Sequence, residues 1–151
     1  MSYHMSLGGD GAAAVGDRRP TARWAVRAAR LLVRLPPNRI EWVLRQLRRG
    51  SRPASYDDAE SWRRQVVAVS PDAAGRFGCL VRSVATTLLG RRYGAWTTWC
   101  VGVRTELPFA AHAWVEAEGK LVGEPGDMDT FSRLIEVGPD TDGGEDVSGR
   151  R

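Results

Sequence analysis

Apolar residues recur every three or four positions over the first two thirds of the chain, with many arginines between them. This is the spacing of amphipathic helices, which bury one face and leave the other in water. It predicts helices at about 21–34, 37–49 and 57–69, and a fourth helix that begins at Cys79 and ends at Gly90. Prolines and glycines, which stop helices, lie between these segments.

After about residue 94 the apolar positions alternate with polar or small ones, which is the period of a β-strand. Strands are predicted at 98–103, 111–117 and 120–124, with a last short strand at 134–137. Helices followed by strands predict an α+β fold, in which N-terminal helices precede a small antiparallel sheet.

The two ends of the chain differ from its middle. Residues 1–16 are mostly small or polar, and residues 138–151 are acidic and rich in glycine, so both are expected to be disordered tails. The part between them, 17–137, is long enough for one domain with its own core. Its helical portion is expected at 17–92 and its sheet at 95–137.

Composition and charge narrow the class of protein. The chain has 151 residues, a net charge of +4 and an uneven excess of arginine between residues 17 and 64. A basic region could bind nucleic acid, but no helix-turn-helix, RNA-binding or zinc-finger motif is present, so no nucleic-acid partner is expected. A solvated helix face explains the arginines most simply, and a docking face for an acidic peptide or protein is the alternative.

The sequence also bears on location and cofactors. No apolar run is long enough to cross a bilayer, and the first residues lack the pattern of a secretory signal, so a cytoplasmic protein with no membrane partner is expected. The chain has two cysteines and two histidines, scattered without the spacing of a zinc site. We therefore expect free thiols, no metal and no cofactor.

Cys79 is the residue whose predicted position would make its side chain most reactive. It follows Gly78 and lies in the first turn of its helix, where the positive end of the helix dipole stabilises a thiolate. The unpaired N–H groups of that turn can also bind the oxyanion of a tetrahedral intermediate. A lone cysteine is more often a small buried hydrophobe, so a base within reach is needed to support catalysis.

His112 is the candidate base. Alternation places it on one face of its strand with Trp114 and Glu116. A three-residue hairpin loop at 117–119, with glycine in the left-handed position, predicts that Glu116 faces Lys120 and that His112 faces Glu124. Cross-strand partners are close enough for the Glu124 carboxylate to orient the imidazole, as in a catalytic triad.

The third residue depends on that register. A two-residue loop would shift the pairing by one position and turn Glu124 to the other face. Asp127 is then the alternative orienter, with Asp129 a more distant one. Cys100 is interpreted as a packing residue. Arg82, one turn after Cys79, is expected either near the site or paired with an acid elsewhere.

The strings around these residues resemble those of one family. They read CLVRS from Cys79, VGV from Val101 and PFAAHAWVE from Pro108. Together they resemble the lasso peptide biosynthesis B2 proteins, which are leader peptidases of the transglutaminase-like superfamily with a papain-like core. The resemblance covers about residues 76–137. Many members have aspartate where this chain has Glu124.

The resemblance implies a function and partners. Proteins of this kind remove the leader from a ribosomally made precursor peptide, together with a small leader-recognition protein of the B1 type and beside a lasso cyclase. It implies Cys79 as nucleophile, His112 as base and a carboxylate from the next strand. The same residues could instead transfer the acyl group to an amine, and a non-catalytic peptide-binding protein of this fold is the alternative outside enzymes.

Overall fold

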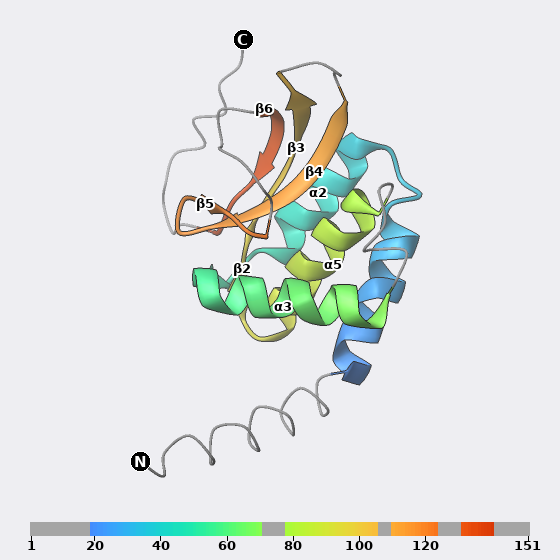
Figure 1. Ribbon diagram of the computed structural model, residues 1–151, viewed down its shortest axis with the longest axis vertical. Helices are drawn as coiled ribbons and strands as arrows, with labels where there is room; N and C mark the ends of the chain where they lie inside the picture. The colour runs from blue at the N-terminus through green and yellow to red at the C-terminus, as the bar shows by residue number, and fades with distance from the viewer. Residues whose placement is uncertain (1–18, 71–77, 106–109, 124–130, 141–151) are drawn as a thin grey trace.

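The computed structural model describes residues 19–70, 78–105, 110–123 and 131–140 (Figure 1). The elements, in chain order, are a helix at 19–32, α2 (Pro37–Leu47), β1 (Arg52–Pro53), α3 (Tyr56–Val69), α5 (Cys79–Arg92), β2 (Ala95–Trp96), β3 (Thr98–Arg104), β4 (Ala111–Ala117), β5 (Lys120–Leu121) and β6 (Phe131–Val137). Helices precede a four-stranded antiparallel sheet, so the predicted α+β fold is confirmed. Among the described residues, no helix has the length and apolar character needed to cross a bilayer.

Helix boundaries follow local chemistry. Helix α2 begins at a proline, whose fixed φ suits the first helical position. Helix α3 is capped by Ser55, whose side chain accepts a hydrogen bond from the Asp58 N–H. Helix α5 does not end at Gly90 as predicted but continues to Arg92. Gly90 is instead a packing position, because a Cβ there would lie 2.7 Å from the ring of Trp62 on α3.

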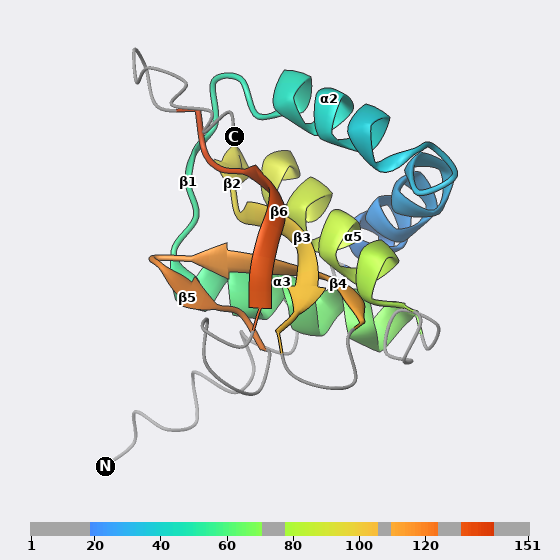
Figure 2. The same cartoon turned by 90° about the horizontal axis from the view of Figure 1, so that it is seen from above.

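Helix α5 forms the centre of the core. Every residue from 82 to 90 is buried, and the helix packs against α3 on one side and against β3 and β4 on another (Figure 2). Two buried polar contacts fix it to the β2–β3 segment. The Thr87 and Thr97 hydroxyls lie 2.9 Å apart, and Trp99 Nε1 donates to Ser83 Oγ at 3.1 Å. These bonds set the position of the helix start relative to the sheet.

The main sheet has the strand order β5-β4-β3-β6. A separate pair, β1 with β2, is parallel and only two residues long, and neither segment is among the strands predicted from the sequence. A pair this short buries little alternating surface, so it leaves no periodic signal.

Strand β6 contains a bulge that the sequence did not reveal. Val101 pairs with Ile135 and Gly102 pairs with Arg133, so Leu134 has no partner on β3. One extra residue inverts the alternation of the strand. Ile135 and Val137 therefore pack with the core, while the start of the strand, from Phe131, keeps the opposite phase. The predicted strand began at 134 because the bulge interrupts the alternation there.

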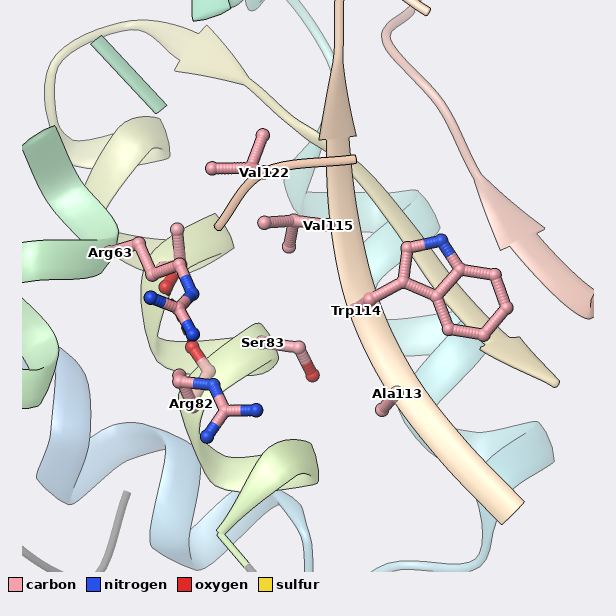
Figure 3. A pocket seen from close by; sticks show the side chains of 8 residues that line it. Arg63, Arg82, Ser83, Ala113, Trp114, Val115 and Val122 are labelled. Carbon is pink, nitrogen blue, oxygen red and sulfur yellow. Dashed lines mark hydrogen bonds between the residues drawn. The ribbon is translucent and has the colours of Figure 1, made fainter. Parts of the chain in front are cut away.

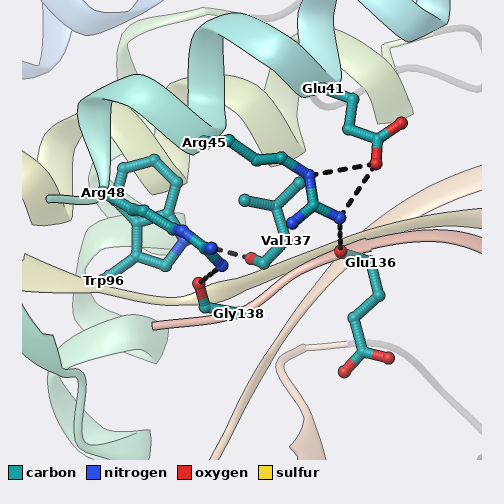
Figure 4. A network of polar contacts seen from close by, with 7 residues as sticks. All are labelled: Glu41, Arg45, Arg48, Trp96, Glu136, Val137 and Gly138. Carbon is teal, nitrogen blue, oxygen red and sulfur yellow. Dashed lines mark hydrogen bonds and ion pairs between the residues drawn. The ribbon is translucent and has the colours of Figure 1, made fainter. Parts of the chain in front are cut away.

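Arginines of α2 fasten β6 to the helical layer (Figure 4). Arg45 forms an ion pair with Glu41 at 2.9 Å and donates to the Glu136 carbonyl at 3.3 Å. Arg48 donates to the carbonyl of Gly138 at 3.2 Å, within the segment that the sequence assigned to a tail. These arginines therefore bind other parts of the protein and do not all belong to a solvated helix face, which was the simplest explanation from the sequence.

Candidate active site

Cys79 is the first residue of α5, as the sequence predicted. No side chain caps this helix start, and the first intrahelical bond runs from the Arg82 N–H to the Gly78 carbonyl, at 2.8 Å. The backbone N–H groups of the three residues before Arg82 therefore have no acceptor within the helix. They and the helix dipole favour negative charge beside the partly exposed Cys79 thiol.

Strand β4 presents an open edge to this helix start. The Arg104 N–H bonds to the Ala110 carbonyl, and bonded positions recur every second residue along an antiparallel pair. The backbone groups of Ala113 and Val115 must therefore point away from β3. The bond from the Val122 N–H to the Val115 carbonyl, at 3.0 Å, shows this directly. At Ala113 the same edge faces Cys79.

Cys79 and His112 lie in contact at this edge. A hydrogen bond with the His112 side chain lowers the pKa of the Cys79 thiol below its ordinary value. Burial acts in the opposite direction, while a hydrogen bond from the Ala113 backbone and the positive charges of His112 and Arg82 lower the pKa further. The fold thus brings together the two residues that sequence analysis singled out, 33 positions apart in the chain.

Arg82 lies one turn into α5 and is almost fully buried. It lines a small pocket of about 10 Å³ between α5 and β4, together with Ser83 and Ala113 (Figure 3). A pocket of this size has room for about one water molecule. Arg82 therefore contributes positive charge near the thiol from within the protein, as its predicted place near the site requires.

The face of β4 that points away from α5 carries an aromatic cluster. The imidazole of His112 stacks on Trp114, with ring centroids 6.0 Å apart, and on Phe131 of β6, at 5.2 Å. Trp114 and Phe131 lie 5.0 Å apart, so the three rings touch one another. Figure 3 shows Trp114 directed away from α5, whereas Val115 points toward it.

The hairpin register predicted from the sequence is wrong. Glu116 pairs with Leu121 and Ala117 with Lys120, so the loop has two residues, Glu118 and Gly119. Both have positive φ, at 53° and 72°, as a type I′ turn requires. The expected three-residue loop assumed that only the glycine adopts this conformation, because it is uncommon for glutamate.

Two consequences follow for the predicted acid residues. Glu116 does not form a surface ion pair with Lys120. It is buried and accepts hydrogen bonds from Trp114 Nε1 at 3.0 Å and from Arg133 Nη2 at 2.6 Å. The observed register also removes the pairing that set Glu124 opposite His112.

The candidate third residues themselves lie elsewhere. Glu124, Asp127 and Asp129 all fall outside the described residues. Within the described part of the chain, no three His, Cys, Asp or Glu side chains gather as a metal site would need.

Cys100 has the opposite environment to Cys79. It lies on β3 directly across from Trp114 and is fully buried, as expected for a packing residue. Burial raises the pKa of the Cys100 thiol, and the nearby carboxylates of Glu116 and Glu136 raise it further. Its thiol therefore stays protonated at neutral pH.

Several residues of this site escaped sequence analysis. Ser83 donates to the Leu80 carbonyl of the preceding helical turn at 3.0 Å. Its bond from Trp99 could not be foreseen without the packing of helix on sheet. Phe131 and Arg133 were missed because the bulge in β6 hides the alternation that would have placed them on the face of His112.

Comparison with known proteins agrees with this architecture. A family model described as the transglutaminase-like superfamily matches residues 22–136, about three quarters of the chain. No match was found among curated proteins or among solved structures. The matched region includes helix 19–32 almost entirely, the central helix with Cys79, and the sheet with His112. This chain therefore belongs to the transglutaminase-like superfamily.

Proposed function

We propose that the protein is a cysteine peptidase that removes the leader from a ribosomally made lasso precursor peptide. The observation that carries the proposal is the hydrogen-bonded pair of Cys79 and His112 at the start of α5. A thiol with a lowered pKa, beside an imidazole and N–H groups that have no acceptor within the helix, can carry out nucleophilic acyl chemistry. The narrower identity as a leader peptidase rests on the resemblance of the strings around these two residues.

The proposed reaction has two steps. The Cys79 thiolate attacks the carbonyl at the end of the leader, and N–H groups of the first turn of α5 bind the resulting oxyanion. As the C–N bond breaks, His112 gives its proton to the departing amine of the core peptide. Water, deprotonated by His112, then hydrolyses the thioester and releases the leader as a carboxylic acid.

Replacing the nucleophile tests the peptidase role. We expect Cys79→Ala to abolish cleavage of a lasso precursor peptide, measured by mass spectrometry with a leader-recognition protein present. Cys100→Ala is the matched control and should retain cleavage, because the Cys100 thiol is fully buried in the sheet and stays protonated at neutral pH. Full cleavage by Cys79→Ala would overturn the proposal.

The third residue of the triad is proposed to be Glu124 or Asp127. The register that favoured Glu124 over Asp127 does not hold, so Glu124 no longer has precedence over Asp127. Glu124→Gln and Asp127→Asn remove one charge each with little change of shape. Only the true orienter should lower kcat strongly, and equal, small losses in both variants would leave His112 without a carboxylate partner from this segment.

Acyl transfer to an amine is the second candidate reaction, since the chain belongs to the transglutaminase-like superfamily. The same thioester forms, but an amine instead of water attacks it. The mass of the product distinguishes the two, because hydrolysis leaves a free acid on the leader and aminolysis leaves an amide.

We further propose that the first two helices bind an acidic surface of the small leader-recognition protein. Residues 19–49 contain nine arginines and a single acidic residue, Glu41. Trp24, Leu31 and Trp42 are more than half exposed on these helices. Beside Trp42, the residues Leu35, Asn38, Arg39 and Val43 line a groove of about 520 Å³. A concave, apolar groove with a basic rim fits an acidic protein segment that carries an apolar anchor.

The partner surface has its own test. We expect Arg39→Glu to weaken binding of the recognition protein in a titration by at least about tenfold. Arg64→Glu on α3 is the control with the same charge change on another exposed surface, and it should bind normally. Equal losses in both variants would show a general effect of net charge. The cyclase is expected to act on the released core peptide, and no surface is assigned to it.

A further inference from the structure

The imidazole of His112 lies against two aromatic rings, one from its own strand and one from β6. Trp114 stacks on it with an interplanar angle of 17°, and Phe131 with an angle of 27°. Stacked rings restrict the torsions of a histidine side chain, because rotation out of the stack loses the contact. The torsions matter here because they decide whether the imidazole meets the Cys79 thiol.

Trp114 is itself fixed in orientation. Its Nε1 donates to Glu116 Oε1 at 3.0 Å, and that same oxygen accepts from Arg133 Nη2 at 2.6 Å and from Arg133 Nε at 3.2 Å. The Glu116 side chain is only 6% exposed. A buried carboxylate held by an arginine makes a rigid acceptor, so the indole cannot turn without losing its bond.

The sheet is adapted to hold this arrangement. Gly102 of β3 faces His112 across the strand pair. A Cβ there would lie 2.9 Å from the indole of Trp114 and would collide with the Ser132 carbonyl oxygen. The bulge at Leu134 sets the phase of β6 so that Phe131 and Arg133 share one face of the sheet. Both features leave the space that the indole and its partners occupy.

We propose that Glu116, fixed by Arg133, is a positioning residue that acts through Trp114 to hold His112 against Cys79. It is distinct from the triad carboxylate, because Glu116 lies four residues along the strand from His112 and bonds to the indole and to Arg133. Phe131 completes the stack from the other strand. The inference rests on the proposed function in taking His112 as the catalytic base, but its main readout requires no substrate.

The test is the pH profile of Cys79 alkylation by iodoacetamide, in chains that carry Cys100→Ala so that one thiol reports. Glu116→Leu removes the acceptor for Trp114, and the apparent pKa of Cys79 should rise by about half to one pH unit. Glu116→Gln keeps an acceptor oxygen for the indole and should stay near the parent profile. A merely structural role for Glu116 would lower thermal stability without moving this pKa.

A second variant protects the test against loss of folding. Phe131→Leu removes one stacked ring from a partly exposed position and leaves the buried hydrogen bond between Trp114 and Glu116 intact. It should shift the profile in the same direction by a smaller amount. If either folded variant, Glu116→Leu or Phe131→Leu, shows the parent profile, the positioning role is overturned. In a cleavage assay the same variants should lower kcat and leave KM unchanged.

The design separates two failures. If Cys79 in the parent chain titrates at an ordinary thiol pKa, the Cys79–His112 pair and the proposed function fail together. If the parent pKa is lowered and the variants do not change it, only the role of Glu116 and its neighbours fails.

Discussion

Cys79 and Cys100 show how one fold gives two thiols opposite chemistry. Cys79 lies where a helix begins against an open strand edge, so hydrogen-bond donors and positive charge surround it. Cys100 lies in the middle of β3, across from Trp114 and near two carboxylates. The pKa of the first thiol is lowered and that of the second is raised. The end of a helix, where N–H groups lack partners, supplies what the interior of a sheet cannot.

The largest expected consequence is a difference in reactivity. At neutral pH, iodoacetamide should alkylate Cys79 on the order of a hundredfold faster than Cys100, because the thiolate reacts and Cys100 is both protonated and fully buried. Peptide mapping of the labelled chain measures both rates at once. In denaturant the two rates should become equal. Comparable rates in the folded chain would contradict the assignment of the two environments.

The next effect is on stability and concerns Gly102, which lies on β3 two residues from Cys100 and directly across from His112. Gly102→Ala should lower the free energy of unfolding by about 3 kcal/mol or more, because the new methyl group meets the Ser132 backbone and the Trp114 ring. Gly119→Ala is the control in open space, where the left-handed φ of 72° costs about 1–2 kcal/mol. Urea unfolding compares the two. A smaller loss for Gly102→Ala would mean that β6 moves away easily.

The amino-acid sequence predicts the elements of this fold well where they repeat a period. Helix α3 was predicted within one residue of its start, and β4 was predicted with its observed bounds, because each shows several turns or alternations. Elements without a period were missed. The pair β1–β2 is too short to show a period. The bulge of β6 breaks the alternation that would have predicted a strand starting at Phe131.

The residues of the site differ in the same way in how well the sequence predicts them. Cys79 stands out because its position depends on a local helix start, and His112 because it lies in an alternating strand. The orientation of Glu116 toward Trp114 and Arg133 depends instead on a hairpin register, and that register turned on whether Glu118 would adopt a positive φ. A single backbone torsion, which sequence patterns specify weakly, decided which carboxylate faces which partner.

The smallest predicted effect is on how the free energy of unfolding depends on pH, because the two thiols have different pKa values in the folded chain. Cys100 has a raised pKa in the folded chain, so its stabilising contribution is complete below the unfolded value near 9 and is lost as pH rises above it. Between pH 8 and 10 the parent chain should therefore lose about 1.4 kcal/mol more stability than Cys100→Ala. Urea unfolding at several pH values measures this difference.

Cys79→Ala is the matched control, and its sign is reversed. The pKa of Cys79 is lowered by folding, so its contribution is present above the unfolded value and is lost as pH falls through the folded one. The stability difference between this variant and the parent should thus change below pH 9, and that of Cys100→Ala above it. Parallel stability curves for the parent and Cys100→Ala would show that Cys100 ionises equally in both states. Its burial across from Trp114 would then have to be transient, because a thiol kept from water in the native state cannot ionise as readily as one in the unfolded chain.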